Sequence, residues 1–214
     1  MFRRIILSFI LAGSSATLSL RSSTQLPRPN LGVLDTSGPI TYVIEDGARV
    51  PGYHSSDRGL AKMALAAWTR ESGGKLKFVE IKGTAQPLVR VRWVSPNQGL
   101  FGEMERIFVN EKPGAIVNVT AQVEVLGDPL ATRAVQDGLL RDTIVYLTCV
   151  HELGHAVGLS HTRNFEDIMY YFGYGGDIVQ YFMRYRNKLQ SRADIPKYSG
   201  LSAGDAASLH DLYK

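Results

Sequence analysis

The chain has 214 residues, of which 44% are hydrophobic and 21% charged, and its formal net charge is +4. This length suits one substantial hydrophobic core and is short for two, so we expect a single globular domain. The small net charge gives no indication of a nucleic-acid or acidic-polymer partner. The single cysteine, Cys149, excludes an internal disulfide bond.

The first 20 residues have the layout of a secretory signal peptide. A short basic start is followed by an apolar run from Ile5 to Leu11 and by small residues from Gly13 to Ala16. The alternative is an uncleaved membrane anchor, but the apolar run is short for a membrane span. We therefore predict export, by secretion or into a periplasm, with no stable membrane association once residues 1–20 are removed.

Residues 21–38 are rich in Ser, Thr, Pro and Gly and are predicted to be a linker, so the domain would cover residues 39–214. Strands are expected at Ile40–Ile44, Lys77–Ile81, Leu88–Val94, Arg106–Asn110 and Ala115–Val125, with turns at Pro96-Asn97 and Lys112–Gly114.

Two long helices are predicted in the domain. The first follows the N-cap candidates Ser55, Ser56 and Asp57, has apolar residues at helical spacing, and closes at Gly73-Gly74. The second runs from Leu139 to Val157 and carries apolar residues on most of its sides, which indicates a largely buried helix. Together, the helices and strands predict an α/β or α+β domain.

The second helix carries the most informative pattern of the chain. His151 and His155 lie one turn apart on one helix face, so both rings can reach one ion. Gly158 allows the chain to leave the helix in a left-handed conformation, which turns His161 back toward the same ion. These three imidazoles predict a metal site.

Three protein ligands leave one coordination position open, which is typical of catalytic rather than structural zinc. Cys149 lies about 200° around the helix from His151 and is expected to be a buried packing thiol. Glu152 is not needed as a ligand and is well placed as a general base. The pattern therefore predicts one catalytic Zn²⁺ ion and peptide-bond hydrolysis by a zinc-bound water that Glu152 activates. Imidazole sites also accept cobalt, nickel or copper.

The histidine motif and the segment after it resemble the metzincin clan of zinc metallopeptidases, and within it the matrixin family. Asp167-Ile168-Met169-Tyr170 stands eight residues after His161, and the resemblance implies that Met169 lies in the Met-turn beneath the metal. It also implies an α+β domain with a mixed, twisted sheet, two long helices and a C-terminal helix after the Met-turn, for which Leu201 to Tyr213 is the similar segment.

Tyr170 and Tyr171 follow the Met-turn methionine, and two roles are open for them. The first is a place in the core or in the wall of a substrate pocket. The second is an auxiliary role at the zinc, because the astacin and serralysin branches of the clan carry an assisting tyrosine at the position of Tyr171.

The chain departs from the matrixin pattern in three ways. Residues 83–150 contain no histidine, so the additional structural zinc of many matrixins is not expected, while calcium is left open. The segment Pro27–Gly32 has no thiol for cysteine-switch latency. Residues 173–199 form an insertion with a helical apolar stripe, expected either to pack as an extra helix or to shape a substrate pocket or bind a partner.

Competing functions also follow from the residues. The metal site could stabilise a non-catalytic extracellular interaction domain, although metal binding alone does not require Glu152. The same hydrolytic chemistry could act on a non-protein amide such as a cell-wall peptide bridge. The favoured hypothesis is a secreted, monomeric zinc endopeptidase that acts on a protein or peptide substrate, with no nucleic-acid partner.

Overall fold

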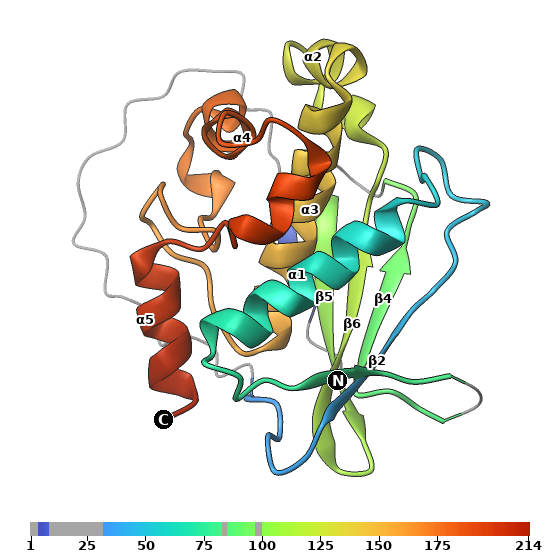
Figure 1. The fold of residues 1–214 in the computed structure, drawn as a ribbon, viewed down its shortest axis with the longest axis vertical. Helices are drawn as coiled ribbons and strands as arrows, with labels where there is room; N and C mark the ends of the chain where they lie inside the picture. The colour runs from blue at the N-terminus through green and yellow to red at the C-terminus, as the bar shows by residue number, and fades with distance from the viewer. Residues whose placement is uncertain (1–3, 9–31, 83–84, 97–99) are drawn as a thin grey trace.

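A mixed, twisted β-sheet and five α-helices make up the part of the chain that the computed structural model describes, namely residues 4–8, 32–82, 85–96 and 100–214 (Figure 1). The strands are β1 (Arg4–Ser8), β2 (Ile40–Ile44), β3 (Phe78–Glu80), β4 (Val89–Trp93), β5 (Leu100–Val109) and β6 (Lys112–Val119). Their order in the sheet is β1-β5-β6-β4-β2-β3. Strands β3, β2, β4 and β6 are parallel, whereas β5 is antiparallel to β6 and β1 to β5. The expected α+β class with a mixed sheet is confirmed.

Among the described residues, five α-helices and three 3₁₀ turns accompany the sheet. They are α1 (Asp57–Glu71), α2 (Leu130–Gln136), α3 (Gly138–Ala156), α4 (Ile178–Arg186) and α5 (Ala203–Leu212), with short 3₁₀ turns η1 (Val123–Leu126), η2 (Phe172–Tyr174) and η3 (Arg192–Lys197). Helix α3 packs against β5 and β6 on one side and against α1 and α4 on others. This position explains why almost every residue from Leu140 to Ala156 is buried.

The start of α3 is set by Asp137, whose side chain accepts hydrogen bonds from the backbone N–H groups of Leu139 and Leu140 at 3.0 and 3.1 Å. The helix then runs almost as predicted, and Cys149 is a buried free thiol within it. Burial raises the pKa of this thiol, so it stays protonated and inert.

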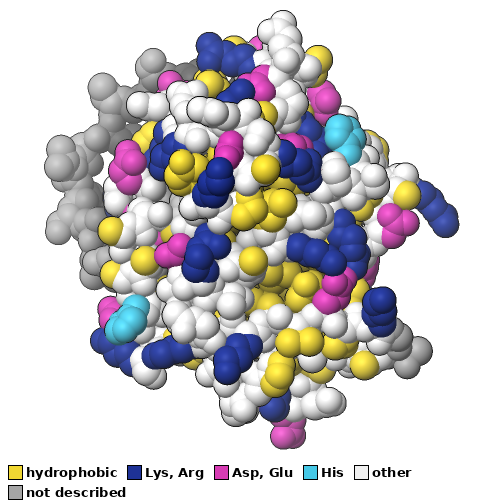
Figure 2. All heavy atoms as spheres, in the orientation of Figure 1, with side chains coloured by type: hydrophobic (Ala, Val, Ile, Leu, Met, Phe, Trp, Pro, Cys, Tyr) yellow, Lys and Arg dark blue, Asp and Glu magenta, His cyan; other side chains and the backbone are white. Residues whose placement is uncertain are grey.

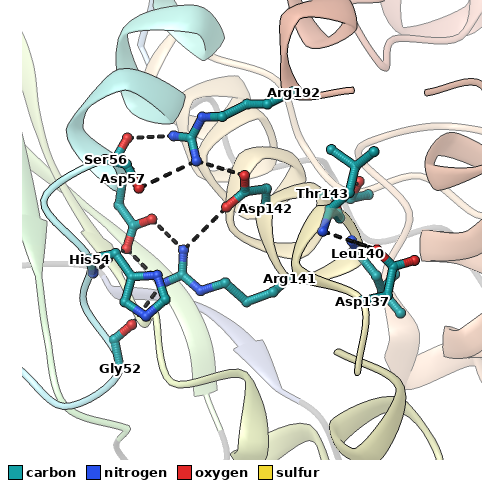
Figure 3. A network of polar contacts seen from close by, with 11 residues as sticks. Gly52, His54, Ser56, Asp57, Asp137, Leu140, Arg141, Asp142, Thr143 and Arg192 are labelled. Atoms are coloured by element: carbon teal, nitrogen blue, oxygen red, sulfur yellow. Dashed lines mark hydrogen bonds and ion pairs between the residues drawn. The ribbon is translucent and has the colours of Figure 1, made fainter. Parts of the chain in front are cut away.

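A buried ion pair joins the first turns of α1 and α3 (Figure 3). The Asp57 carboxylate is inaccessible to solvent and is held by both terminal nitrogens of Arg141, with Nη2 at 2.7 Å from Oδ2. Arg141 also donates to the carbonyl of Gly52 at 2.6 Å, and His54 N donates to Asp57 at 2.8 Å. Both carboxylate oxygens of Asp57 and both terminal nitrogens of Arg141 have partners, so the pair connects the loop before α1 to α3.

The predicted element boundaries are wrong between residues 100 and 125. Strand β5 begins at Leu100 rather than Arg106, and β6 ends at Val119, before the 3₁₀ turn η1. The predicted turn at Lys112–Gly114 is the beginning of β6. The hairpin instead turns at Asn110 and Glu111, which adopt φ angles of 49° and 65°.

Gly114 lies within β6 and allows a close approach of the neighbouring backbone, since a Cβ there would lie 2.5 Å from the carbonyl oxygen of Leu88. Helix α2 was not predicted.

The N-terminal region is described only in part. Residues 1–3 and 9–31 of the predicted signal peptide and linker lie outside the described residues, while Arg4–Ser8 form the edge strand β1. At the end of the predicted linker, Leu34 is buried and its N–H donates to the hydroxyl of Tyr213 at 3.1 Å. Among the described helices, none has the length and apolar character that crossing a membrane would need.

The segment 173–199 packs onto the domain as η2, α4 and η3. Its apolar stripe is buried, including Tyr181, Phe182, Tyr185 and Leu189. On the face shown in Figure 2, Lys and Arg side chains are interspersed with Asp and Glu side chains.

Candidate metal centre

Three histidine rings converge at the C-terminal end of α3. His151 and His155 come from the helix and His161 from the loop after it. The Nε2 atom of His161 lies 3.3 Å from that of His151 and 3.1 Å from that of His155. The structure thus brings together all three residues that the sequence predicted as ligands.

The tautomers of two rings follow from their hydrogen bonds. His151 Nδ1 lies 2.6 Å from the carbonyl oxygen of Ile168, and His155 Nδ1 lies 2.9 Å from that of Leu159. A carbonyl only accepts, so both Nδ1 atoms carry the proton and both Nε2 atoms present lone pairs. Lone pairs that face one another repel unless a cation lies between them.

The geometry fits zinc. Tetrahedral coordination with Zn–N distances of about 2.0–2.1 Å separates ligand nitrogens by about 3.3 Å, close to the two separations in this structure. Burial is the largest cause that lowers the pKa of each of the three histidines. The pKa of His151 falls to about 4 and that of His161 to about 3, and the pKa of His155 is lowered as well. The neutral imidazoles that a metal requires are therefore favoured at neutral pH.

Gly158 makes the exit from α3 that the sequence predicted. Its φ angle is 107°, which side-chain-bearing residues rarely adopt, and its N–H donates to the carbonyl of His155 at 3.0 Å. Leu159 N then donates to the carbonyl of Gly154 at 2.9 Å. These bonds close the helix and turn His161 back toward the two helical histidines.

Glu152 lies beside the histidines with a buried carboxylate. Within the described residues, neither of its carboxylate oxygens has a hydrogen-bond partner. Burial is the main cause that raises the pKa of Glu152 well above its usual value, and the charge of Glu103 adds to it. A buried, unpartnered carboxylate is costly to a fold, so this one indicates a functional role.

The backbone of β5 comes close to this carboxylate at Gly102. A Cβ atom at that position would lie 2.5 Å from Oε1 and 2.8 Å from Cδ of Glu152. Glycine at this position therefore leaves the space that the Glu152 side chain occupies. Sequence reasoning missed Gly102 because the contact joins two segments 50 residues apart in the chain.

Met169 lies beneath the histidine pair. Its side chain is buried, and its sulfur fills the space that a Cβ at Gly154 would need. The turn around it is held from α5, where the Asp205 carboxylate accepts from the N–H groups of Ile168 at 2.7 Å and Met169 at 3.3 Å. Asp205 itself is part of a capping box with Ser202. The role of Asp205 in the turn was also missed from the sequence.

The two tyrosines after Met169 occupy different environments. Tyr170 is buried, and its hydroxyl donates to the carbonyl of Gly175 at 2.9 Å, so it belongs to the core. Tyr171 is half-buried, and its ring centroid lies 4.8 Å from that of His161. Tyr171 therefore forms one wall of the histidine cluster.

A family model described as matrixin matches residues 35–180. The chain belongs to the matrixin family. No curated protein matches the sequence. The matrixin match covers the region from β2 to the first residues of α4, and it includes the three histidines, Glu152 and Met169. Membership in this family makes the protein a metallopeptidase and supports a catalytic zinc ion at the histidine cluster.

The matrixin match ends one residue before Tyr181, in the first turn of α4. The remainder of α4, together with η3 and α5, lies beyond it.

Within the described ranges, His151, His155 and His161 form the one group of His, Cys, Asp or Glu residues placed to hold a metal ion. A single zinc ion stays the prediction for this domain, and the sequence makes no prediction about calcium.

Proposed function

We propose that the protein is an exported, zinc-dependent endopeptidase in which His151, His155 and His161 hold the metal and Glu152 is the general base. The observation that carries this proposal is the pairing of three converging imidazole nitrogens with a buried carboxylate that has no partner in the described structure. A purely structural metal site would not need that carboxylate.

The chemistry divides between the metal and Glu152. Zinc, when bound, would lower the pKa of a water molecule toward about 7 and polarise the peptide carbonyl. Glu152 would take the proton from the attacking water and deliver it to the departing amine. Burial favours the protonated carboxyl, whereas a nearby cation favours the ionised form. These opposing effects suit a group that must both accept and release a proton.

The substrate would bind as an extended strand on the edge of β5. That edge pairs with β1 in the structure, with Arg4 opposite Glu105, Ile5 opposite Met104 and Ile6 opposite Glu103. Gly102 of the same strand adjoins Glu152. An extended peptide on this edge would therefore pass the carboxylate, with Tyr171 as a wall of the site.

The location and assembly of the protein belong to the same proposal. The signal-peptide pattern of residues 1–20 supports export, by secretion or into a periplasm. We further propose that the exported domain is a monomer without stable membrane association. The insertion 173–199 is proposed to support the site through α4.

The deciding experiment compares the protein with its Glu152→Gln variant on unfolded casein and a mixed peptide library, with zinc added and then chelated. Glutamine keeps the size of the side chain but cannot take up the proton, so we expect zinc binding to persist and turnover to fall by about 10²- to 10⁴-fold. Substantial residual activity in the variant would refute the assigned base.

The same experiment separates the competing functions. If both proteins bind zinc and neither cleaves any protein or peptide, a zinc-stabilised interaction domain is favoured. Cleavage of a cell-wall peptide bridge alone would instead assign the hydrolase a non-protein amide. Chelator-sensitive cleavage of casein by the parent supports the endopeptidase.

A further inference from the structure

The hydroxyl of Tyr181 in α4 reaches the backbone group that orients a predicted zinc ligand. It donates to the carbonyl oxygen of Ile168 at 3.0 Å. The same oxygen accepts the Nδ1–H of His151 at 2.6 Å. A carbonyl oxygen has two lone pairs, so it can accept both bonds at once. Tyr181, Ile168 and His151 thus form a continuous hydrogen-bonded chain from the insertion to the metal site.

The ring of Tyr181 is held firmly in place. It is buried and makes edge-on contacts with Phe165 and Phe172, at centroid distances of 6.0 and 4.9 Å. The guanidinium of Arg184 lies 4.4 Å from the centroid of the Tyr181 ring and donates to the carbonyls of Phe165 and Glu166. Helix α4 therefore fastens both Tyr181 and the loop that precedes the Met-turn.

We propose that Tyr181 is a positioning residue for the zinc ligand His151. Its hydroxyl holds the Ile168 carbonyl in the direction that keeps the His151 ring turned with Nε2 toward the other two histidines. Partners beyond the ligands are known to set the orientation and basicity of metal-binding imidazoles. This inference rests on the proposed zinc site and extends it to a part of the chain outside the matrixin match.

Helix α4 also offers a matched control. Tyr185 is one turn further along and equally buried. Its hydroxyl donates to the carbonyls of Ile195 at 3.2 Å and Tyr198 at 2.9 Å, away from the Met-turn. Removing the hydroxyl of Tyr185 therefore removes a buried hydrogen-bond donor from the same helix without touching the Ile168 carbonyl.

The test uses the full chain and its Tyr181→Phe and Tyr185→Phe variants, each loaded with Zn²⁺ and, separately, with Co²⁺. The rate of zinc release to an excess of chelator and the visible absorption bands of bound cobalt are measured, together with the thermal midpoint. We expect Tyr181→Phe to release zinc about 10-fold faster, at the lower end for partners of metal ligands, and to shift the cobalt bands. Tyr185→Phe should match the parent in both.

Equal zinc release and equal cobalt spectra in Tyr181→Phe and Tyr185→Phe would overturn the positioning role, whatever happens to the thermal midpoint. This result would leave the proposed peptidase intact, because the parent would still bind zinc. Failure of the parent itself to bind zinc would overturn both the positioning role and the proposed function.

Discussion

At the scale of single residues, the site depends on the absence of a side chain at Gly102 as well as on the three histidines. The buried Glu152 carboxylate has little room to move, since β5 passes directly over it at Gly102. Among the described residues this carboxylate has no hydrogen-bond partner, so packing alone orients the proposed general base. Its position therefore depends on the absence of a side chain on the neighbouring strand.

We expect Gly102→Ala to lower kcat by about 100-fold, because the added methyl group would displace Glu152, the proposed general base. Zinc content should be unchanged, since the three atoms nearest to the added methyl group all belong to Glu152. Gly138→Ala is the matched control, because a Cβ there meets nothing within 4 Å. Steady-state kinetics on a fluorescent peptide would measure the effect, and equal kcat values for the two variants would contradict it.

At the scale of elements, α1 and α3 are locked together by the ion pair between Asp57 and Arg141 (Figure 3). Both side chains are removed from solvent, so loss of one partner leaves the other charge buried and unpaired. The neighbouring pair between Arg192 and Asp142, at 2.6 Å, is more exposed on its arginine side. The two pairs should therefore differ in their contribution to stability.

Asp57→Asn is expected to lower the free energy of unfolding by about 3–5 kcal/mol, whereas Arg192→Gln should cost about 0–1 kcal/mol. Urea unfolding of the zinc-loaded proteins would give both values. Similar losses in the two variants would show that burial of the Asp57 pair does not decide its contribution.

The elements also show which parts of the structure could be predicted from the sequence. The three histidines, Gly158 and the length of α3 follow from spacing within one short segment. The turn between β5 and β6 does not, because Asn110 and Glu111 adopt left-handed conformations while the glycine and proline nearby lie in the strand. Gly102, Tyr181 and Asp205 act through contacts between distant segments, for which one sequence carries no signal.

At the scale of the whole molecule, the sheet places the antiparallel strand β5 next to the metal centre. Strand β5 would be the last strand of the domain if β1 were absent. Strand β1 covers that edge and also lies beside η2, which follows the Met-turn. Residues 4–8 of the predicted leader therefore occupy the position that the proposed substrate strand needs, between β5 and η2.

This arrangement predicts competition between the leader and the substrate. The full chain should show a higher KM than a chain without residues 1–20, because the leader competes with the substrate for the edge of β5. The kcat should be unchanged, because the leader does not affect the steps that follow substrate binding. Apparent affinity falls in proportion to the fraction of molecules with a free edge, so an edge free in about a tenth of them raises KM about tenfold. Cleavage of one peptide by both proteins would measure the difference. Identical KM values would mean that β1 does not occupy the substrate's edge of β5 in solution, whereas the expected rise would make removal of the leader the step that opens the site.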